Sequence, residues 1–291
     1  MLLLSLYSAV FSQTALQQLS DADRSLDQAL AERGMRAAFL EVLTDDATVF
    51  RPGAINGKDF WQSRPDSMTP IMVRNLAAID ISANGLLGYT TGNWEMYAKS
   101  KADVPSEIGQ YVTIWEKRLD GKFKATIDIT IAHEKPADAV PDPSRVLAAA
   151  LTGDVNKRRW SAADPSMNFL KLSMSKKALG GAYDKFAAPD IRLLREGETP
   201  ILGKKNAVNA TKDFISIDYP KKVAMLEASD MAYVWNPCEY ANSEEGREKG
   251  TCLHVWKLRN KQWYIVLGVL ARVRNEIKPT IKLREKGKTS N

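Results

Sequence analysis

Residues 109–128 read Gly109-Gln-Tyr-Val-Thr-Ile-Trp-Glu-Lys-Arg-Leu-Asp-Gly-Lys-Phe-Lys-Ala-Thr-Ile-Asp128 and carry the clearest strand-turn-strand signal of the chain. Large side chains alternate from Tyr111 to Trp115, a Leu-Asp-Gly-Lys turn follows, and an apolar run resumes at Phe123. Alternation of this kind is typical of a half-buried strand, because successive side chains point to opposite faces of a sheet. The stretch therefore predicts a β-hairpin.

The same layout returns in the second half of the chain. Residues 250–268 read Gly250-Thr-Cys-Leu-His-Val-Trp-Lys-Leu-Arg-Asn-Lys-Gln-Trp-Tyr-Ile-Val-Leu-Gly268, so that Trp256 matches Trp115. Nearly the same offset aligns the helices, turns and strands that precede the two hairpins. A match in this order predicts a duplicated domain.

The predicted elements have the order of an α+β protein in both halves. Helices come first and a run of antiparallel strands follows, without the strand-helix alternation of a parallel sheet. In the first half we predict helices at 20–33, 35–43 and from Gly57 towards Ser67, and strands at 47–50, 76–83, 86–97, 110–118 and 122–132. In the second half we predict helices at 145–152 and 166–186, weakened at Gly180-Gly181, and strands at 191–194, 222–228, 231–240, 251–259 and 262–273.

Changes in composition and the positions of the prolines divide the 291 residues into five segments. The chain is long enough for two domains, each with its own core. Three prolines in a short polar run mark a linker between them. The predicted segments are a leader at 1–15, a first domain at 16–134, the linker at 135–144, a second and divergent domain at 145–275, and a basic tail at 276–291.

The leader and the tail suggest where the protein resides. Met1 to Ala15 has an apolar core too short to span a bilayer, which is typical of a secretory signal with cleavage near Ser12-Gln13, although no Lys or Arg precedes it. A buried N-terminal helix is the alternative. The formal charge of +6 is concentrated from Arg272 onwards, which indicates a solvated tail or a strip that docks on an acidic surface. We expect a periplasmic or secreted protein with no stable membrane insertion after signal removal and no nucleic-acid partner.

Two cysteines, Cys238 and Cys252, flank a polar segment centred on Glu245. A hairpin that turns at this segment brings the two side chains opposite each other, and in an oxidising compartment they can form a disulfide. A register shift of one residue instead places the sulfurs on opposite faces. With only two histidines in addition, the chain offers no evident metal site, and we expect no cofactor.

Several motifs together resemble the SnoaL-like, nuclear transport factor 2-like superfamily, which includes ketosteroid isomerase. They are Thr44-Asp-Asp-Ala-Thr-Val-Phe-Arg-Pro followed by Gly57, Gly88-Tyr-Thr-Thr-Gly-Asn-Trp, and residues 109–128. The resemblance covers residues 18–134 and is weaker but collinear over 146–273. It implies a cone in each half: a strongly bent antiparallel sheet wrapped around helices, with a pocket between the sheet and the first helix.

At the positions of the isomerase's catalytic groups, this sequence has other residue types. The position of its general base holds Arg51, whose guanidinium stays protonated and cannot abstract a proton. No tyrosine occurs in the first helix between Ser20 and Leu43, and Thr113 stands where the family has an oxyanion-binding carboxylic acid. Ketosteroid isomerase activity is therefore not expected, and the same cone serves hydrolases, dehydratases and pure ligand binders.

Period-two alternation predicts which side chains point into the first cone. If Trp115 points inward, so do Tyr111 and Thr113, and Asp128 does so on the next strand. With Arg51 at the rim and Trp94 on a neighbouring strand, these residues predict a pocket for a small polar or aromatic molecule. The alternative is that Arg51 pairs with Asp128 or with backbone groups and that Trp115 only packs in the core.

In the second cone, the alignment places His254 at the position of Thr113 and Gly268 at that of Asp128. A neutral imidazole beside Trp256 can accept a proton near neutral pH, but it lacks a carboxylate to orient it. A hydrogen-bonded core histidine is the alternative interpretation.

Three function classes follow. The leading one is a tandem protein that binds a small organic molecule in the first cone without established catalysis. The second is a lyase, isomerase or hydrolase that uses Asp128 and Arg51, or His254. The third is a structural or interaction module in which the two sheets pack on each other within the chain.

Overall fold

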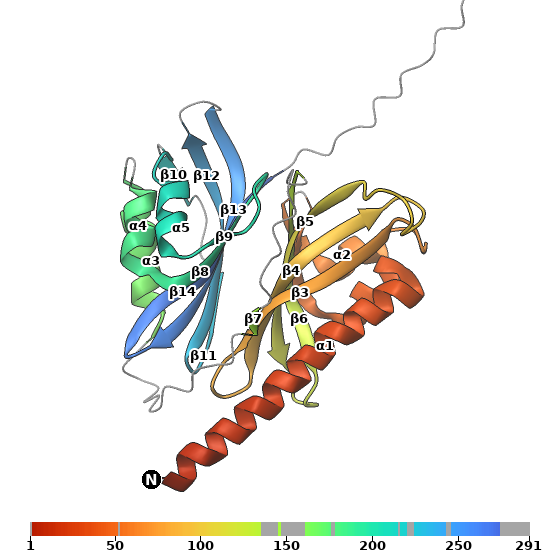
Figure 1. The fold of residues 1–291 in the computed structure, drawn as a ribbon, viewed down its shortest axis with the longest axis horizontal. Coiled ribbons are helices and arrows are strands. Elements are labelled where there is room, and N and C mark those ends of the chain that lie inside the picture. Colours follow the sequence, from red (N-terminus) through yellow and green to blue (C-terminus); the bar gives the residue numbers. More distant parts are fainter. Residues whose placement is uncertain are drawn as a thin grey trace, which may run out of the picture.

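The computed structural model describes residues 2–51, 53–134, 145–146, 161–175, 178–214, 216–219, 224–242 and 246–273. The chain forms two antiparallel-rich sheets that lie side by side, with helices on their outer faces (Figure 1). The α+β fold in two copies, predicted from the order of the elements, is confirmed. The predicted linker at 135–144 and the tail at 276–291 lie outside the described residues.

The first sheet has the strand order β2-β1-β6-β5-β4-β3-β7. Its long strands pair antiparallel in sequence order, and β1 returns to pair parallel with β6. The elements are α1 (Leu2–Val42), β1 (Leu43–Phe50), β2 (Ala54–Asn56), α2 (Gly57–Gln62), β3 (Ile71–Ile81), β4 (Leu87–Tyr97), β5 (Glu107–Lys117), β6 (Phe123–His133) and β7 (Arg145–Val146).

The long helix α1 is kinked at Gly34, where the two helices predicted from the sequence meet. Gly34 has φ 76° and ψ 170°, and a Cβ atom built there would lie 2.5 Å from the carbonyl oxygen of Ser67. Glycine is required because this backbone region is strained for side-chain-bearing residues. The backbone of the predicted leader continues the same helix, and Ala15 and Leu19 just after it are buried in the first core.

The second sheet repeats this layout with the order β10-β12-β13-β14-β8-β9, and β11 pairs with β12. Its elements are α3 (Ala163–Ser173), α4 (Leu179–Phe186), β8 (Ala187–Arg195), β9 (Ile201–Leu202), α5 (Lys204–Thr211), β10 (Ser216–Asp218), β11 (Ala224–Ala228), β12 (Met231–Asn242), β13 (Gly246–Arg259) and β14 (Gln262–Arg272). Strand β8 pairs parallel with β14, as β1 does with β6.

Two local predictions for the second half differ from the structure. The helix expected from Arg145 does not begin there, because Arg145 and Val146 form β7, which adds to the first sheet by pairing parallel with Ala78 and Ile79. Residues 147–152 of that prediction lie outside the described part of the chain. The single helical stretch expected at 166–186 is two helices, α3 and α4.

The two hairpins share an irregularity that supports the repeat. In β5 and β6 the register shifts between Ile114 and Trp115, and in β13 and β14 it shifts between Val255 and Trp256. Both tryptophans are completely buried. A bulge strengthens the local twist of a strand, so the same bulge bends both sheets at the same position.

A continuous apolar cluster joins the two sheets. Side chains at alternate positions of the long strands, which face away from the helices of their own half, form a buried layer between the halves. Its buried members are Phe50, Leu87, Tyr89, Val112, Ile114, Ile127, Ile129, Ile131, Ala188, Leu194, Met231, Leu253, Val255, Val266, Leu267, Val269 and Ala271. Within the described ranges, no helix is long and apolar enough to cross a membrane.

Candidate functional site

A buried ion pair lies at the centre of the first cone. Arg74 of β3 pairs with Asp23 of α1, and the two side chains are only 1% and 2% exposed. Asp23 also accepts hydrogen bonds from the Thr90 hydroxyl over 2.7 Å and from the Tyr111 hydroxyl over 3.2 Å. The guanidinium carbon of Arg74 lies 3.8 Å from the centre of the Tyr111 ring. These contacts fasten the helix to the sheet, because a buried charge is tolerated only when it is paired and hydrogen-bonded.

Asp128 lies in the same interior layer, one strand further along. It is buried and accepts a hydrogen bond from the Thr113 hydroxyl over 2.9 Å. Burial raises the pKa of Asp128, while the charges of Arg74 and Arg51 act in the opposite direction. A carboxyl group whose pKa is raised by desolvation resists ionisation.

The two tryptophans predicted to line the pocket of this cone, Trp94 and Trp115, instead pack in its core. The indole N–H of Trp115 donates to Thr90 over 2.9 Å, and that of Trp94 donates to the carbonyl oxygen of Gln110 over 3.0 Å. Both rings are buried in the first core. Tyr111, Thr113, Trp115, Trp94 and Asp128 are therefore brought together, but in a packed interior.

A second carboxyl group, Asp27 on α1, flanks this layer. Its Oδ1 lies 3.5 Å from Nε of Arg74, and its side chain is 31% exposed. Burial raises the pKa of Asp27 to about 7, and Asp23 raises it further while Arg74 lowers it. The group therefore changes its charge near neutral pH.

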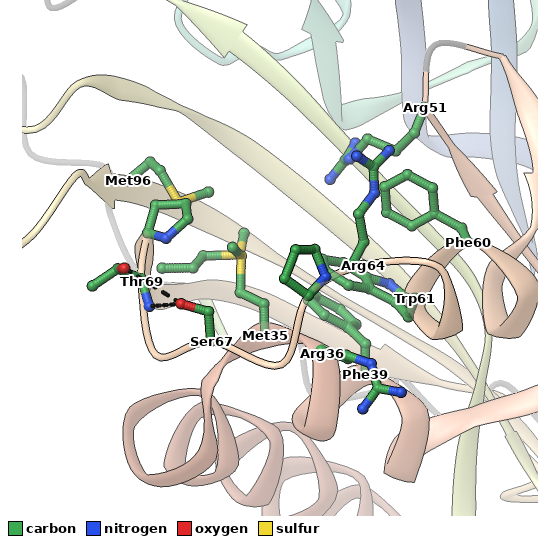
Figure 2. Close-up of a pocket in the computed structure, with 13 residues that line it drawn as sticks. Met35, Arg36, Phe39, Arg51, Phe60, Trp61, Arg64, Ser67, Thr69 and Met96 are labelled. Carbon is green, nitrogen blue, oxygen red and sulfur yellow. Dashed lines mark hydrogen bonds between the residues drawn. The ribbon is translucent and has the colours of Figure 1, made fainter.

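An open pocket of about 440 Å³ lies at the mouth of the first cone (Figure 2). Arg51 is the only residue of the predicted site that lines it. The walls come from α1, the end of β1, α2, the segment that follows α2, β3 and β4. The lining residues are Met35, Arg36, Phe39, Arg51, Phe60, Trp61, Arg64, Pro65, Ser67, Thr69, Pro70, Met72 and Met96.

Aromatic rings and guanidinium groups determine the chemistry of this pocket. Phe39 and Trp61 stack with ring centres 4.6 Å apart and planes inclined by 7°, and Phe60 packs edge-on against Trp61 at 5.0 Å. The guanidinium carbon of Arg64 lies 4.2 Å from the centre of the Phe60 ring. Arg51 donates to the carbonyl oxygen of Phe50 over 3.0 Å. The pocket combines a flat apolar surface with positive charge.

In the second cone, buried aromatic side chains surround His254. His254 is buried, and its Nε2 lies 3.0 Å from the hydroxyl of Tyr183. The ring of Phe169 lies 4.7 Å from the imidazole, and Trp256 packs beside it. Burial lowers the pKa of His254 to about 3, so the imidazole is neutral at physiological pH.

The cysteines meet between β12 and β13. Cys238 and Cys252 form a disulfide whose Cα atoms are 6.1 Å apart. Cys238 faces Gly250 and Cys252 faces Asn236 in the register, so the pair is diagonal, whereas a turn centred on Glu245 predicts that the two cysteines face each other directly. Among the residues that the structure describes, no group of three or more His, Cys, Asp or Glu side chains is placed to hold a metal ion.

Sequence reasoning missed the Asp23–Arg74 pair. Asp23 falls near the start of the helix predicted at 20–33, and Arg74 lies before residue 76, where its strand was predicted to begin. A signal was present, because Asp23 has helical spacing with the buried Leu19, Leu26 and Leu30 and so occupies the apolar face of α1. A carboxylate on that face requires a partner inside the fold.

Comparison with known proteins gives similar folds only. No family model matches the sequence, and no curated protein matches it. Solved structures that are similar include an NTF2-like protein of unknown function from Prochlorococcus marinus, with 17% identity and a TM-score of 0.34 over 40% of this chain and 96% of that one. Another is an NTF-2 like protein of unknown function from Shewanella oneidensis, with 14% identity and a TM-score of 0.31 over 38% of this chain and 99% of that one.

A ketosteroid isomerase-like protein from Erwinia carotovora is also similar, with 15% identity and a TM-score of 0.33 over 39% of this chain and 94% of that one. Each of these structures is matched almost completely by less than half of this chain. The similar structures are thus NTF2-like and ketosteroid isomerase-like proteins, the group that the motifs of the first half resemble.

Proposed function

We propose that the protein binds a small organic molecule in the pocket at the mouth of the first cone. The observation that carries this proposal is the pocket itself: about 440 Å³ lined by aromatic, methionine and arginine side chains. This volume and this mixture of apolar wall and few polar groups are typical of small-molecule sites.

Binding is favoured over catalysis by the positions of the candidate acids and bases. A general base must lie within hydrogen-bonding reach of its substrate. Asp128 and His254 do not line the pocket, and each is buried and engaged by a neighbouring hydroxyl group, that of Thr113 and that of Tyr183 respectively. Neither residue has the geometry of a base poised at this pocket.

We propose that the second half of the chain stabilises the first half by packing against its sheet. Its interior is occupied by Phe169, Tyr183, His254 and Trp256, and its sheet contributes half of the apolar layer between the halves. An interaction role for the whole protein would use this same layer, but the layer is already covered within the chain. We therefore assign packing to the second half and ligand binding to the first.

We also propose that the protein functions in an oxidising compartment, the periplasm or the extracellular space. The Cys238–Cys252 disulfide supports this, because such bonds persist where thiols are not kept reduced. Mass spectrometry of the protein isolated from intact cells tests it. The expected species lacks two hydrogens at the cysteines and begins near Gln13, whereas a reduced protein with its leader intact contradicts the proposal.

The binding proposal is tested by blocking the pocket. Ser67 lines the pocket and is exposed, so Ser67→Trp places an indole in its mouth. Ser25→Trp is the matched control, since Ser25 is exposed on α1 and does not line the pocket. Native mass spectrometry of the purified proteins, and titration of each with small aromatic and aliphatic compounds, measure ligand occupancy.

We expect bound ligand in the wild type and in Ser25→Trp and its loss in Ser67→Trp, with all three proteins melting as folded domains. Equal occupancy in the two variants would contradict the proposed site. Absence of binding in all three proteins would contradict the function.

A further inference from the structure

We propose that the ligand of the first cone is an organic anion with a flat, aromatic-sized apolar body, whose anionic group is bound by Arg51 and Arg64. This inference rests on the proposed function and specifies the chemical class that the pocket selects.

The charge of the pocket wall is the first argument. Three of its lining residues are arginines, Arg36, Arg51 and Arg64, and none is an aspartate or glutamate. Among the described residues, neither Arg36 nor Arg64 lies within 4.0 Å of a carboxylate oxygen. Guanidinium groups such as those of Arg36 and Arg64, which have no carboxylate partner among the described residues, favour an anion. A carboxylate or phosphate matches the paired donors of arginine.

Asp128 does not line the pocket wall. Arg51 acts electrostatically on Asp128, but Asp128 lies in the interior layer beneath the pocket, where Thr113 donates to it. Burial outweighs the nearby arginines and raises the pKa of Asp128, which disfavours its charged form. Arg51 donates a hydrogen bond to the carbonyl oxygen of Phe50, and a guanidinium presents its five donors in a planar fork that fits a carboxylate.

The shape of the apolar wall is the second argument. Phe39 and Trp61 are parallel, and Phe60 stands nearly perpendicular to Trp61 at 80°. Figure 2 shows the three rings on one side of the pocket and the methionines Met35 and Met96 on the other. Aromatic faces and polarizable thioethers are suited to a planar ring, and the guanidinium of Arg64 already lies over such a face.

A set of probes of the same shape and different charge tests the inference. The probes are 2-naphthoate as the anion, 2-naphthalenemethanol as the neutral compound and 2-naphthylmethylammonium as the cation. Isothermal titration at low and at high salt measures their affinities for the wild type. We expect the anion to bind most tightly and its affinity to fall with salt, because ionic strength screens exposed charges.

Charge-removing variants assign the effect to the two arginines. Arg51→Met and Arg64→Met keep most of the side-chain length, and Arg118→Met is the control, since Arg118 pairs with Glu116 away from the pocket. Loss of a charge-assisted hydrogen bond predicts a decrease of about tenfold to a hundredfold in the affinity for 2-naphthoate. The affinity for 2-naphthalenemethanol should change little, and Arg118→Met should match the wild type.

The possible failures are distinguishable. If the neutral probe or the cation binds as tightly as the anion, or if Arg51→Met and Arg64→Met behave as Arg118→Met does, the anion inference is wrong while the pocket remains a binding site. If no probe binds the wild type and Ser67→Trp does not differ from Ser25→Trp in ligand occupancy, the proposed function fails and this inference fails with it. Thermal melts of all variants separate loss of binding from loss of the fold.

Discussion

Thr113 of β5 and Asp128 of β6 face each other across the first hairpin, and the threonine hydroxyl donates to the aspartate over 2.9 Å. The same register position in the second half pairs His254 with Gly268. In both hairpins one further pair follows, Ile114 with Ile127 and Val255 with Leu267, and the bulge comes after it, so the two positions are structurally equivalent. The repeat has thus kept the backbone and exchanged a polar pair for an imidazole that faces a glycine.

Gly268 is expected to be intolerant of any side chain. A Cβ atom built there would lie 3.0 Å from Cδ1 of Leu193 and 3.1 Å from the hydroxyl of Tyr183. Gly268→Ala should therefore lower the free energy of unfolding by about 1–3 kcal/mol, as overpacking does. Gly181→Ala is the control, because nothing lies within 4 Å of that position in α4 and alanine favours a helix. Urea denaturation measures both, and equal effects would contradict this account of the second cone.

Asp27 is expected to make stability depend on pH between about 4 and 7. Its folded pKa is raised to about 7 from 3.8, so the folded state holds a proton that the unfolded state has lost in this range. Stability is therefore full below pH 4 with respect to this group and decreases as the pH rises through 7.

Asp27→Asn should remove this decrease, on the order of 2 kcal/mol after allowance for partial exposure. Melting temperatures from pH 4 to 8 measure the slope. Asp21→Asn is the control, because Asp21 is an exposed residue of the same helix. An unchanged slope in Asp27→Asn would show that the carboxyl group is not desolvated as the structure has it.

His254 is expected to remain neutral throughout the physiological range. Burial lowers its pKa to about 3, and the Tyr183 hydroxyl lies beside Nε2. Its imidazole carbon-bound proton resonances should not shift between pH 5 and 8. A histidine with a depressed folded pKa contributes stability that is present above its unfolded value near 6.5 and is lost as the pH falls below it.

His254→Gln should accordingly lessen the acid sensitivity of the fold while lowering stability at neutral pH. A midpoint near 6.5 for the His254 resonances would contradict its burial and would reopen the possibility of proton transfer in the second cone.

Lys257 lies between the two halves, and removal of its charge is expected to lower the free energy of unfolding strongly. Its buried Nζ donates to the carbonyl oxygen of Ile81 over 2.6 Å and lies 3.3 Å from Asp80 and 3.4 Å from Asp230. Lys257→Met leaves two carboxyl groups buried without their cation, so the free energy of unfolding should fall by about 3–5 kcal/mol.

Arg259→Met provides the comparison, because its pair with Asp190 is partly exposed and should contribute about 1 kcal/mol or less. Denaturant titration at neutral pH measures both variants. A loss in Lys257→Met no larger than that in Arg259→Met would mean that the contact with the first sheet is not maintained in solution.

The sequence by itself determined the order of the long strands and the two hairpins that mark the repeat. Period-two alternation and a turn at Leu119-Asp-Gly-Lys122 specify the first hairpin, and the second follows from the same pattern. Such patterns are local, since the spacing of apolar residues within a strand or helix indicates which of its faces is buried. They also suffice to show that Tyr111, Thr113 and Asp128 point inward.

Only the tertiary structure decided which inward-facing groups meet one another and which reach solvent. The pairing of Asp23 with Arg74 joins α1 to β3, and the pocket near Arg51 draws its walls from segments distant in sequence. Whether a space between elements is filled or open depends on the volumes of all side chains that converge there, which no single periodic pattern records. For this reason the strands could be predicted, whereas the pocket lies at the mouth of the cone and not in the interior where it was predicted.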